Sequence, residues 1–259
     1  MSLVESNEKQ ISYVTGRWGI QEERKTLVFV HGSGGTRLNW NYQRQFFEQS
    51  YNVVVPDLPG HGGARGEGEG SVTAYAEHLL NLIRAIPEEM FCLVGHSMGG
   101  AIVQNFTLLY PQYVEALVLV GTGARLRVLP EILEGLREKF EETVRLINSY
   151  AFSRTSPSDM MERGIEAMLK TRAEVLHGDF TACDRFDIMD RVSNIQVPTL
   201  VVCGSDDLLT PPKYAYYLAE RIEGARLEII GGAGHMVMIE MPDEFNIRVM
   251  KFLQDLLSE

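Results

Sequence analysis

The sequence is short of cysteine and of long apolar runs. Its 259 residues include three cysteines, Cys92, Cys183 and Cys203. An odd number at wide spacing is not typical of a disulfide framework, and Cys92 and Cys203 lie in apolar, strand-like runs, so we expect buried, reduced thiols. No run approaches the about 18 apolar residues that a membrane-spanning helix needs, which predicts that the protein has no membrane span.

Positive charge is scarce as well. Lys and Arg total 24 and Asp and Glu total 35, which gives a formal net charge of −11. Nucleic acids and anionic membranes are bound through clustered Lys and Arg, so neither is an expected partner. The first residues show no basic segment followed by an apolar one, so we expect no signal peptide and a cytoplasmic protein. A small molecule is the expected partner, and the oligomeric state stays open.

Motifs for metals and nucleotides are missing. The sequence contains neither H-E-x-x-H nor C-x-x-C, the patterns that would indicate a zinc or redox site. No glycine cluster fits G-x-G-x-x-G or the P-loop. We therefore expect no metal and no bound cofactor.

The residues that are present predict an α/β protein. Hydrophobic residues make up 45% of the chain and charged residues 23%, which is ordinary for a globular domain of this length. Six short runs that are apolar throughout predict buried parallel strands, at Leu27–Val30, Val53–Val55, Met90–Val94, Ala116–Val120, Thr199–Cys203 and Leu227–Ile230. Helical patterns lie between and after them, at Ala74–Ala85, Ala101–Tyr110, Pro212–Ile222 and Glu244–Leu257. This alternation predicts a mostly parallel sheet with helices on both faces.

One interval breaks the alternation. Residues 124–194 contain no convincing strand, and apolar residues recur at helical spacing from Ile132 to Ile147, with Pro157 able to start a further helix. We interpret 124–194 as a helical cap inserted between two strands of a core made of residues 1–123 and 195–259. The alternative is a helical bundle packed elsewhere, with no role in a site.

Ser97 is the first candidate for chemistry. The segment Gly95-His96-Ser97-Met98-Gly99 follows a predicted strand and precedes a predicted helix, and G-x-S-x-G in that position is the nucleophile elbow of serine hydrolases. The glycines remove side chains that would clash in so tight a turn. A serine at a helix start is also a common N-cap, and the isolated motif does not exclude that reading.

A serine nucleophile needs a base and an acid. Of six histidines, His235 alone lies in a loop between the last predicted strand and the C-terminal helix. Asp206 and Asp207 directly follow the strand Thr199–Cys203, although two aspartates there could simply cap the next helix. In an open parallel sheet these positions lie at the ligand-binding edge, and the chain order nucleophile, acid, base is that of α/β hydrolases.

Five segments carry a family resemblance, at residues 28–35 (VFVHGSGG), 54–62 (VVPDLPGHG), 93–100 (LVGHSMGG), 197–212 (VPTLVVCGSDDLLTPP) and 232–246 (GAGHMVMIEMPDEFN). Through them the chain resembles the α/β-hydrolase superfamily over nearly its whole length, and in particular small bacterial carboxylesterases, enol-lactonases and meta-cleavage C–C hydrolases. The resemblance implies that Asp207 is the acid, that the backbone N–H groups of Ser33 and Met98 form the oxyanion hole, and that Asp57 and His61 are structural turn residues.

Ester hydrolysis is the expected function. Ser97 would attack an acyl carbonyl, His235 would take its proton, and Asp207 would orient the imidazole. The apolar face of the cap and its methionines favour small, mostly apolar acids. Lactone opening and C–C bond hydrolysis are alternatives, for which Arg125 or Arg127 would bind a substrate carboxylate, unless both are surface arginines without a ligand. A receptor or scaffold that binds a small molecule on the same fold is the non-enzymatic alternative.

Overall fold

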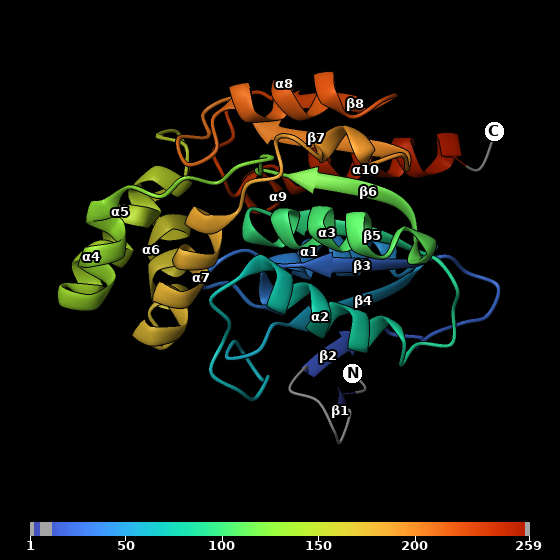
Figure 1. The fold of residues 1–259 in the computed structure, drawn as a ribbon, viewed down its shortest axis with the longest axis horizontal. Helices are drawn as coiled ribbons and strands as arrows, with labels where there is room; N and C mark the ends of the chain where they lie inside the picture. Colours follow the sequence, from blue (N-terminus) through green and yellow to red (C-terminus); the bar gives the residue numbers. More distant parts are fainter. Residues whose placement is uncertain (1–2, 6–11, 257–259) are drawn as a thin grey trace.

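A single twisted sheet forms the centre of the protein. The computed structural model describes residues 3–5 and 12–256. Its eight strands follow the order β1-β2-β4-β3-β5-β6-β7-β8, and β3 to β8 run parallel (Figure 1). The strands are β1 (Leu3–Glu5), β2 (Ser12–Thr15), β3 (Thr26–Val30), β4 (Asn52–Asp57), β5 (Phe91–His96), β6 (Val114–Val120), β7 (Thr199–Gly204) and β8 (Arg226–Ile230). The predicted fold class, an α/β-hydrolase fold with a mostly parallel sheet, is confirmed.

The two N-terminal strands were absent from the sequence-based prediction. β2 pairs antiparallel with both β1 and β4, and extends the sheet beyond its parallel part. With three and four residues, these strands are too short to show a periodicity of their own. They form because β4 offers an unpaired edge, which is a tertiary property.

Helices cover both faces of the sheet. Apolar side chains of α2, α3 and α8 pack on one face, and those of α1, α9 and α10 pack on the other. The helices of the core, including short 3-10 helices (η), are η1 (Arg37–Trp40), α1 (Asn41–Phe47), α2 (Val72–Ile83), α3 (Met98–Leu109), η2 (Pro111–Tyr113), η3 (Val192–Asn194), α8 (Pro212–Arg221), α9 (Val237–Glu240) and α10 (Pro242–Leu256). Both layers are needed because the parallel strands are apolar on each side.

Four helices lie between β6 and β7, beyond the carboxyl ends of the parallel strands (Figure 1). We call them the cap: α4 (Pro130–Glu138), α5 (Phe140–Ala151), α6 (Ser158–Met168) and α7 (Ala173–Arg185). They share a small apolar core of Ile132, Leu136, Val144, Ile147, Ile165 and Leu176. The predicted helical insertion is confirmed, whereas 124 and 194 as its limits stay a prediction.

The strand order reverses between β3 and β5. β4 lies on one side of β3 and β5 on the other, so the loops that follow β3 and β5 separate at the sheet edge. Such a reversal opens a crevice at the carboxyl ends of the strands, where ligands bind in open α/β sheets. The loop His31–Gly35 and the turn at Ser97 flank this crevice.

No helix in the described part of the chain is long and apolar enough to cross a membrane.

Cys92, Cys183 and Cys203 are buried, free thiols, which confirms the expectation from the sequence.

Candidate active site

Ser97 occupies a strained turn between β5 and α3. It has a φ of 53°, and among the residues described it is the only non-glycine residue with positive φ. Its N–H donates to the Val120 carbonyl at 2.9 Å, and its carbonyl accepts from Thr122 Oγ1 at 2.8 Å. Backbone strain of this kind costs roughly 1–3 kcal/mol and persists only where the surroundings impose it.

The neighbouring glycines allow the turn to close. A Cβ on Gly95 would lie 2.4 Å from the Gly99 carbonyl oxygen, and a Cβ on Gly99 would lie 2.3 Å from the Val30 carbonyl oxygen. Side chains are therefore excluded at both positions. The tight contacts leave Ser97 on the wall of a cavity between core and cap.

Asp207 and His235 form a buried pair at the ends of β7 and β8. His235 Nδ1 lies 2.9 Å from Asp207 Oδ2, and the two residues are 4% and 2% exposed. Asp207 Oδ1 accepts from the N–H groups of Leu209 and Thr210. Burial alone would raise the pKa of Asp207, but His235 and the bonds from Thr210 outweigh it and lower that pKa. The carboxylate thus stays charged beside the imidazole.

Thr210 belongs to this arrangement, and sequence reasoning missed it. Its hydroxyl donates to Asp207 Oδ2 at 2.8 Å and lies 3.1 Å from His235 Nδ1. The available signal was a threonine three residues after the acid, in the same loop. Asp206 has another role: its carboxylate accepts from Ser153 Oγ and Ser205 Oγ, each at 2.8 Å, and lies in the contact between core and cap.

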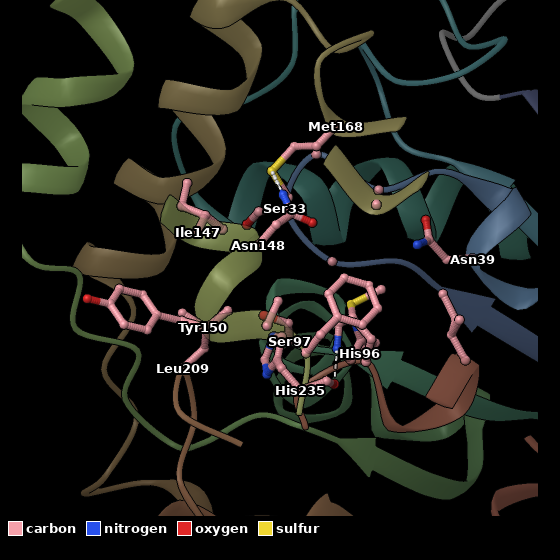
Figure 2. Close-up of a pocket in the computed structure, with 18 of the residues that line it drawn as sticks. Ser33, Asn39, His96, Ser97, Ile147, Asn148, Tyr150, Met168, Leu209 and His235 are labelled. Atoms are coloured by element: carbon pink, nitrogen blue, oxygen red, sulfur yellow. Dashed lines mark hydrogen bonds between the residues drawn. The ribbon is translucent and has the colours of Figure 1, made fainter. Parts of the chain in front are cut away.

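The ring of His235 faces the cavity that Ser97 lines (Figure 2). Among the hydrogen bonds of the described residues, none joins the Ser97 hydroxyl to His235. Catalytic hydrogen bonds of serine hydrolases are often long without substrate and shorten in the complex.

His96 packs against His235 and hydrogen-bonds to its backbone. Its ring centroid lies 4.6 Å from that of His235, and its Nε2 donates to the His235 carbonyl at 3.0 Å. Burial and the neighbouring His235 lower the pKa of His96 to about 3, so this ring stays neutral. A neutral ring adds no positive charge next to the imidazole that must accept a proton.

The cap also holds His235. The His235 N–H donates to the Ala151 carbonyl at the end of α5 at 2.8 Å. Glu240 accepts from the Gly234 N–H through one carboxylate oxygen and from the Ser153 N–H through the other. The cap is therefore joined to the loop that carries His235 by a backbone hydrogen bond and by the Glu240 carboxylate. The sequence pattern could not reveal these contacts.

Ser33 and Met98 lie on the two loops that flank the crevice. Ser33 Oγ donates to Met98 Sδ at 3.6 Å, so the loops are in direct contact. Within the part of the chain that the structure describes, no hydrogen bond engages the backbone N–H of either residue. An oxyanion hole requires backbone amides that are free of protein partners, and these two meet that requirement.

The cavity has a volume of about 900 Å³ and is walled by core loops and by the cap. Figure 2 shows Ser33, Ser97 and His235 around the same space as Ile147, Asn148 and Met168 of the cap. Exposed apolar side chains surround the entrance, at Leu38, Tyr42, Leu129, Tyr150 and Leu208. Among the described residues that line the cavity, none is acidic. Because cap helices line it, the alternative in which the helical segment packs away from any site is wrong.

Arg125 and Arg127 are engaged by the cap. Arg125 binds Asp187 through Nε and Nη2, each at 2.7 Å from Oδ2, and is absent from the described cavity lining. Arg127 lines the cavity, but its Nη1 donates to the Asp184 carbonyl at 2.7 Å and its Nη2 lies 3.7 Å from Asp187 Oδ2. The two arginines therefore share the Asp187 carboxylate, and both are engaged by groups of the protein itself.

Known proteins share the family and the fold of this chain. Residues 25–242 match the α/β hydrolase fold family. A solved structure described as a thermophilic esterase superposes with a TM-score of 0.85 at 38% identity, and covers 98% of this chain and 97% of its own. A second, described as Est816, an N-acyl homoserine lactone degrading enzyme, gives a TM-score of 0.85 at 26% identity over 97% of this chain and 100% of its own.

A curated relative points to a further reaction. The 2-hydroxy-6-oxo-6-phenylhexa-2,4-dienoate hydrolase of Comamonas testosteroni is 28% identical over 271 residues, which are 96% of this chain and 94% of that protein. The relatives thus include hydrolases of esters, lactones and C–C bonds on one fold.

Proposed function

The chain belongs to the α/β hydrolase fold family, and on that basis we propose that it is a serine hydrolase of carboxyl esters with small, mostly apolar acids. Ser97 is the nucleophile, His235 the general base and Asp207 the residue that orients His235. The N–H groups of Ser33 and Met98 form the oxyanion hole. The reaction needs no bound cofactor.

Hydrolysis proceeds in two steps. Ser97 Oγ attacks the ester carbonyl while His235 Nε2 takes its proton, and the oxyanion is bound by the two amides. His235 then returns the proton to the leaving alcohol, and an acyl-enzyme remains. Water, activated by the same histidine, releases the acid and restores Ser97.

The observation that carries this proposal is the strained Ser97 on the cavity wall next to the buried Asp207–His235 pair. A serine in ordinary N-cap geometry would have negative φ and a side chain bonded to the helix backbone. Ser97 makes no such side-chain bond. The strain is explained if the turn presents the hydroxyl to a substrate.

A neutral substrate agrees with the cavity lining. Arg125 and Arg127 are already engaged, both by the Asp187 carboxylate and Arg127 also by the Asp184 backbone carbonyl. A carboxylate-bearing substrate would have to displace one of these contacts. Ester hydrolysis is therefore favoured over cleavage of an anionic diketone acid.

C–C bond hydrolysis is the second candidate. Arg127 lines the cavity, and the Comamonas relative acts on a substrate of that class. An enol-lactone that carries a carboxylate would need the same cation.

A fluorophosphonate probe followed by peptide mapping tests the mechanism. Labelling at Ser97 that is lost in His235→Ala is expected. A wild-type protein that remains unlabelled would instead favour a receptor or scaffold on this fold.

A substrate panel tests the specificity. We expect p-nitrophenyl butyrate to be hydrolysed with higher kcat/KM than any anionic enol-lactone or meta-cleavage diketone acid. If an anionic substrate wins by tenfold or more, and Arg127→Ala removes that preference while Arg145→Ala does not, the esterase assignment gives way to the second candidate. Arg145 is a matched control because it forms ion pairs within the cap but is absent from the described cavity lining.

A further inference from the structure

A second buried carboxylate lies on the cap, in α7. Asp179 of α7 is fully buried and accepts three hydrogen bonds from the core. Its Oδ2 accepts from the Gly34 N–H at 2.9 Å and from His61 Nε2 at 2.8 Å, and its Oδ1 accepts from Tyr75 Oη at 2.5 Å. We call these four residues the Asp179 cluster. It joins the cap to the loop that carries Ser33.

His61 is positively charged in this cluster, as its partners require. Its Nε2 faces the Asp179 carboxylate and its Nδ1 faces the Pro59 carbonyl at 3.0 Å. Both partners are acceptors, so both ring nitrogens must carry a proton. Burial alone would lower the pKa of His61, but Asp179 and the Pro59 carbonyl outweigh it and raise that pKa. The pair of His61 and Asp179 is therefore neutral as a whole.

Asp179 engages a backbone donor of the turn that carries Ser33. The turn from Gly32 to Gly35 is closed by a bond from the Gly35 N–H to the Gly32 carbonyl at 3.0 Å, and Gly34 has a φ of 63°. Asp179 engages the N–H of Gly34, the last residue before that closing bond. Within the turn, the N–H of Ser33 remains for a ligand. The Gly34 bond also fixes the plane of the peptide that follows Ser33, and together with the bond that closes the turn it restricts the backbone on both sides of the Ser33 amide.

We propose that Asp179 is a positioning residue, which holds the Ser33 N–H in oxyanion-binding geometry through the N–H of Gly34. The proposal rests on the function proposed above, in which the Ser33 amide binds the oxyanion. Asp179 contacts neither the substrate nor Ser97. Its consequence is that a residue of the cap controls turnover, in addition to any effect of the cap on substrate choice.

Asp179→Asn isolates the Gly34 contact. The amide can keep Tyr75 as a donor to its oxygen and give an N–H to a neutral His61, which still donates to Pro59. In that orientation the amide nitrogen faces the Gly34 N–H, and this bond is lost. The net charge of the cluster stays zero, so a change in rate reports the lost hydrogen bond.

We expect kcat of Asp179→Asn for p-nitrophenyl butyrate to fall about 10- to 100-fold, because loss of an oxyanion donor itself costs about 10²–10³-fold. KM should stay within about threefold of wild type, since the cavity wall is unchanged. The inhibition constant of a trifluoromethyl ketone, which forms a tetrahedral oxyanion on Ser97, should rise by the same factor as kcat falls.

Tyr75→Phe is the matched control. It removes a different hydrogen bond to the same carboxylate and leaves the Gly34 bond in place. It should lower the melting temperature, while kcat and the inhibition constant stay within about threefold of wild type. The proposal is overturned if Asp179→Asn changes KM and the melting temperature but leaves kcat and the inhibition constant as in wild type.

If Asp179→Asn does not fold, Thr171→Val is the variant that tests the proposal. Thr171 Oγ1 donates to the Gly34 carbonyl at 3.3 Å and positions the same peptide segment from the cap. A fall in kcat of about threefold or more at constant KM supports the proposal, and a kcat within twofold of wild type overturns it. A wild-type protein that neither hydrolyses the ester panel nor labels at Ser97 overturns the proposed function itself, whereas an active wild type with an unaffected Asp179→Asn overturns this inference alone.

Discussion

The molecule contains two buried histidine–aspartate pairs, and they differ in what the second ring nitrogen of the histidine faces. His235 and Asp207 are joined at 2.9 Å, and His61 and Asp179 at 2.8 Å. In the first pair, Nδ1 points to the carboxylate, and among the described residues Nε2 makes no hydrogen bond. In the second pair both nitrogens donate to acceptors. The same two residue types therefore give a histidine with one ring nitrogen free of protein partners and a histidine with both ring nitrogens engaged.

The pairs also join different parts of the molecule. Asp207 and His235 follow neighbouring core strands, so the sheet itself brings them together. His61 belongs to the core and Asp179 to the cap, so their contact forms only when the cap packs on the core. We infer that the first pair determines chemistry and the second determines how cap and core are held.

The largest expected effect on kcat comes from replacing Ser97, the proposed nucleophile. Ser97→Ala should lower kcat by roughly 10³-fold or more, because removal of the nucleophile of a serine hydrolase leaves only oxyanion and binding effects. The melting temperature should change little or rise, since alanine loses one oxygen at a cavity wall. A Ser97→Ala variant that keeps a tenth of wild-type turnover would contradict the inference that the His235–Asp207 pair determines the chemistry.

Replacing the acid separates two neighbours in one loop. Asp207→Asn should lower kcat roughly 10²- to 10⁴-fold, because an amide favours the wrong tautomer of His235 and does not offset its positive charge. Asp206→Asn should keep kcat within about threefold, since Asp206 binds Ser153 and Ser205. Steady-state kinetics of both variants check this. The reverse ranking would show that Asp206, not Asp207, is the residue that orients His235.

Replacing each histidine in turn compares how much the two pairs contribute to the free energy of unfolding. His61→Ala should lower the free energy of unfolding by about 3–5 kcal/mol, because Asp179 is left as a buried charge without its counter-ion. His235→Ala should cost about 1–2 kcal/mol, since Asp207 keeps three hydrogen bonds from Leu209 and Thr210. Urea unfolding of both variants measures the difference. Equal losses would show that the two pairs do the same structural work.

The smallest effect is the pH dependence of stability. The raised pKa of His61 stabilises the protein below the unfolded value of about 6.5, and that contribution is lost as the pH rises through the folded pKa. The lowered pKa of Asp207 acts at the other end: its contribution is present above 3.8 and is lost as the pH falls through the folded pKa.

The His61 contribution can be measured by difference. The unfolding free energies of wild type and His61→Ala should differ most below about pH 6.5 and converge as the pH rises through the raised folded pKa of His61. A constant difference across this range would mean that His61 is neutral in the folded protein. The same series with Tyr75→Phe serves as the control, because that change leaves the imidazolium and its carboxylate together.

Much of the fold followed from apolar runs and turn residues. All six predicted strands are present, with boundaries that differ by at most two residues, and helix α2 begins at Val72 where Ser71 caps it. β1 and β2 were missed because such short segments take their structure from the edge they pair with. In the cap, the apolar periodicity suggested helix from Ile132 to Ile147 but did not show the break at Lys139 that divides α4 from α5.

By itself, the sequence determined the parallel sheet, the elbow at Ser97 and the loops that carry Asp207 and His235. These depend on local patterns: apolar runs, glycine spacing and the order of residues at strand ends. Only the tertiary structure decided that Thr210 shares the bond to His235, that Ala151 and Glu240 hold the base loop, and that Asp179 meets His61. The reason is distance along the chain. Asp179 lies 118 residues from His61, and a polar side chain on a helix shows no partner in sequence until burial removes water and requires one.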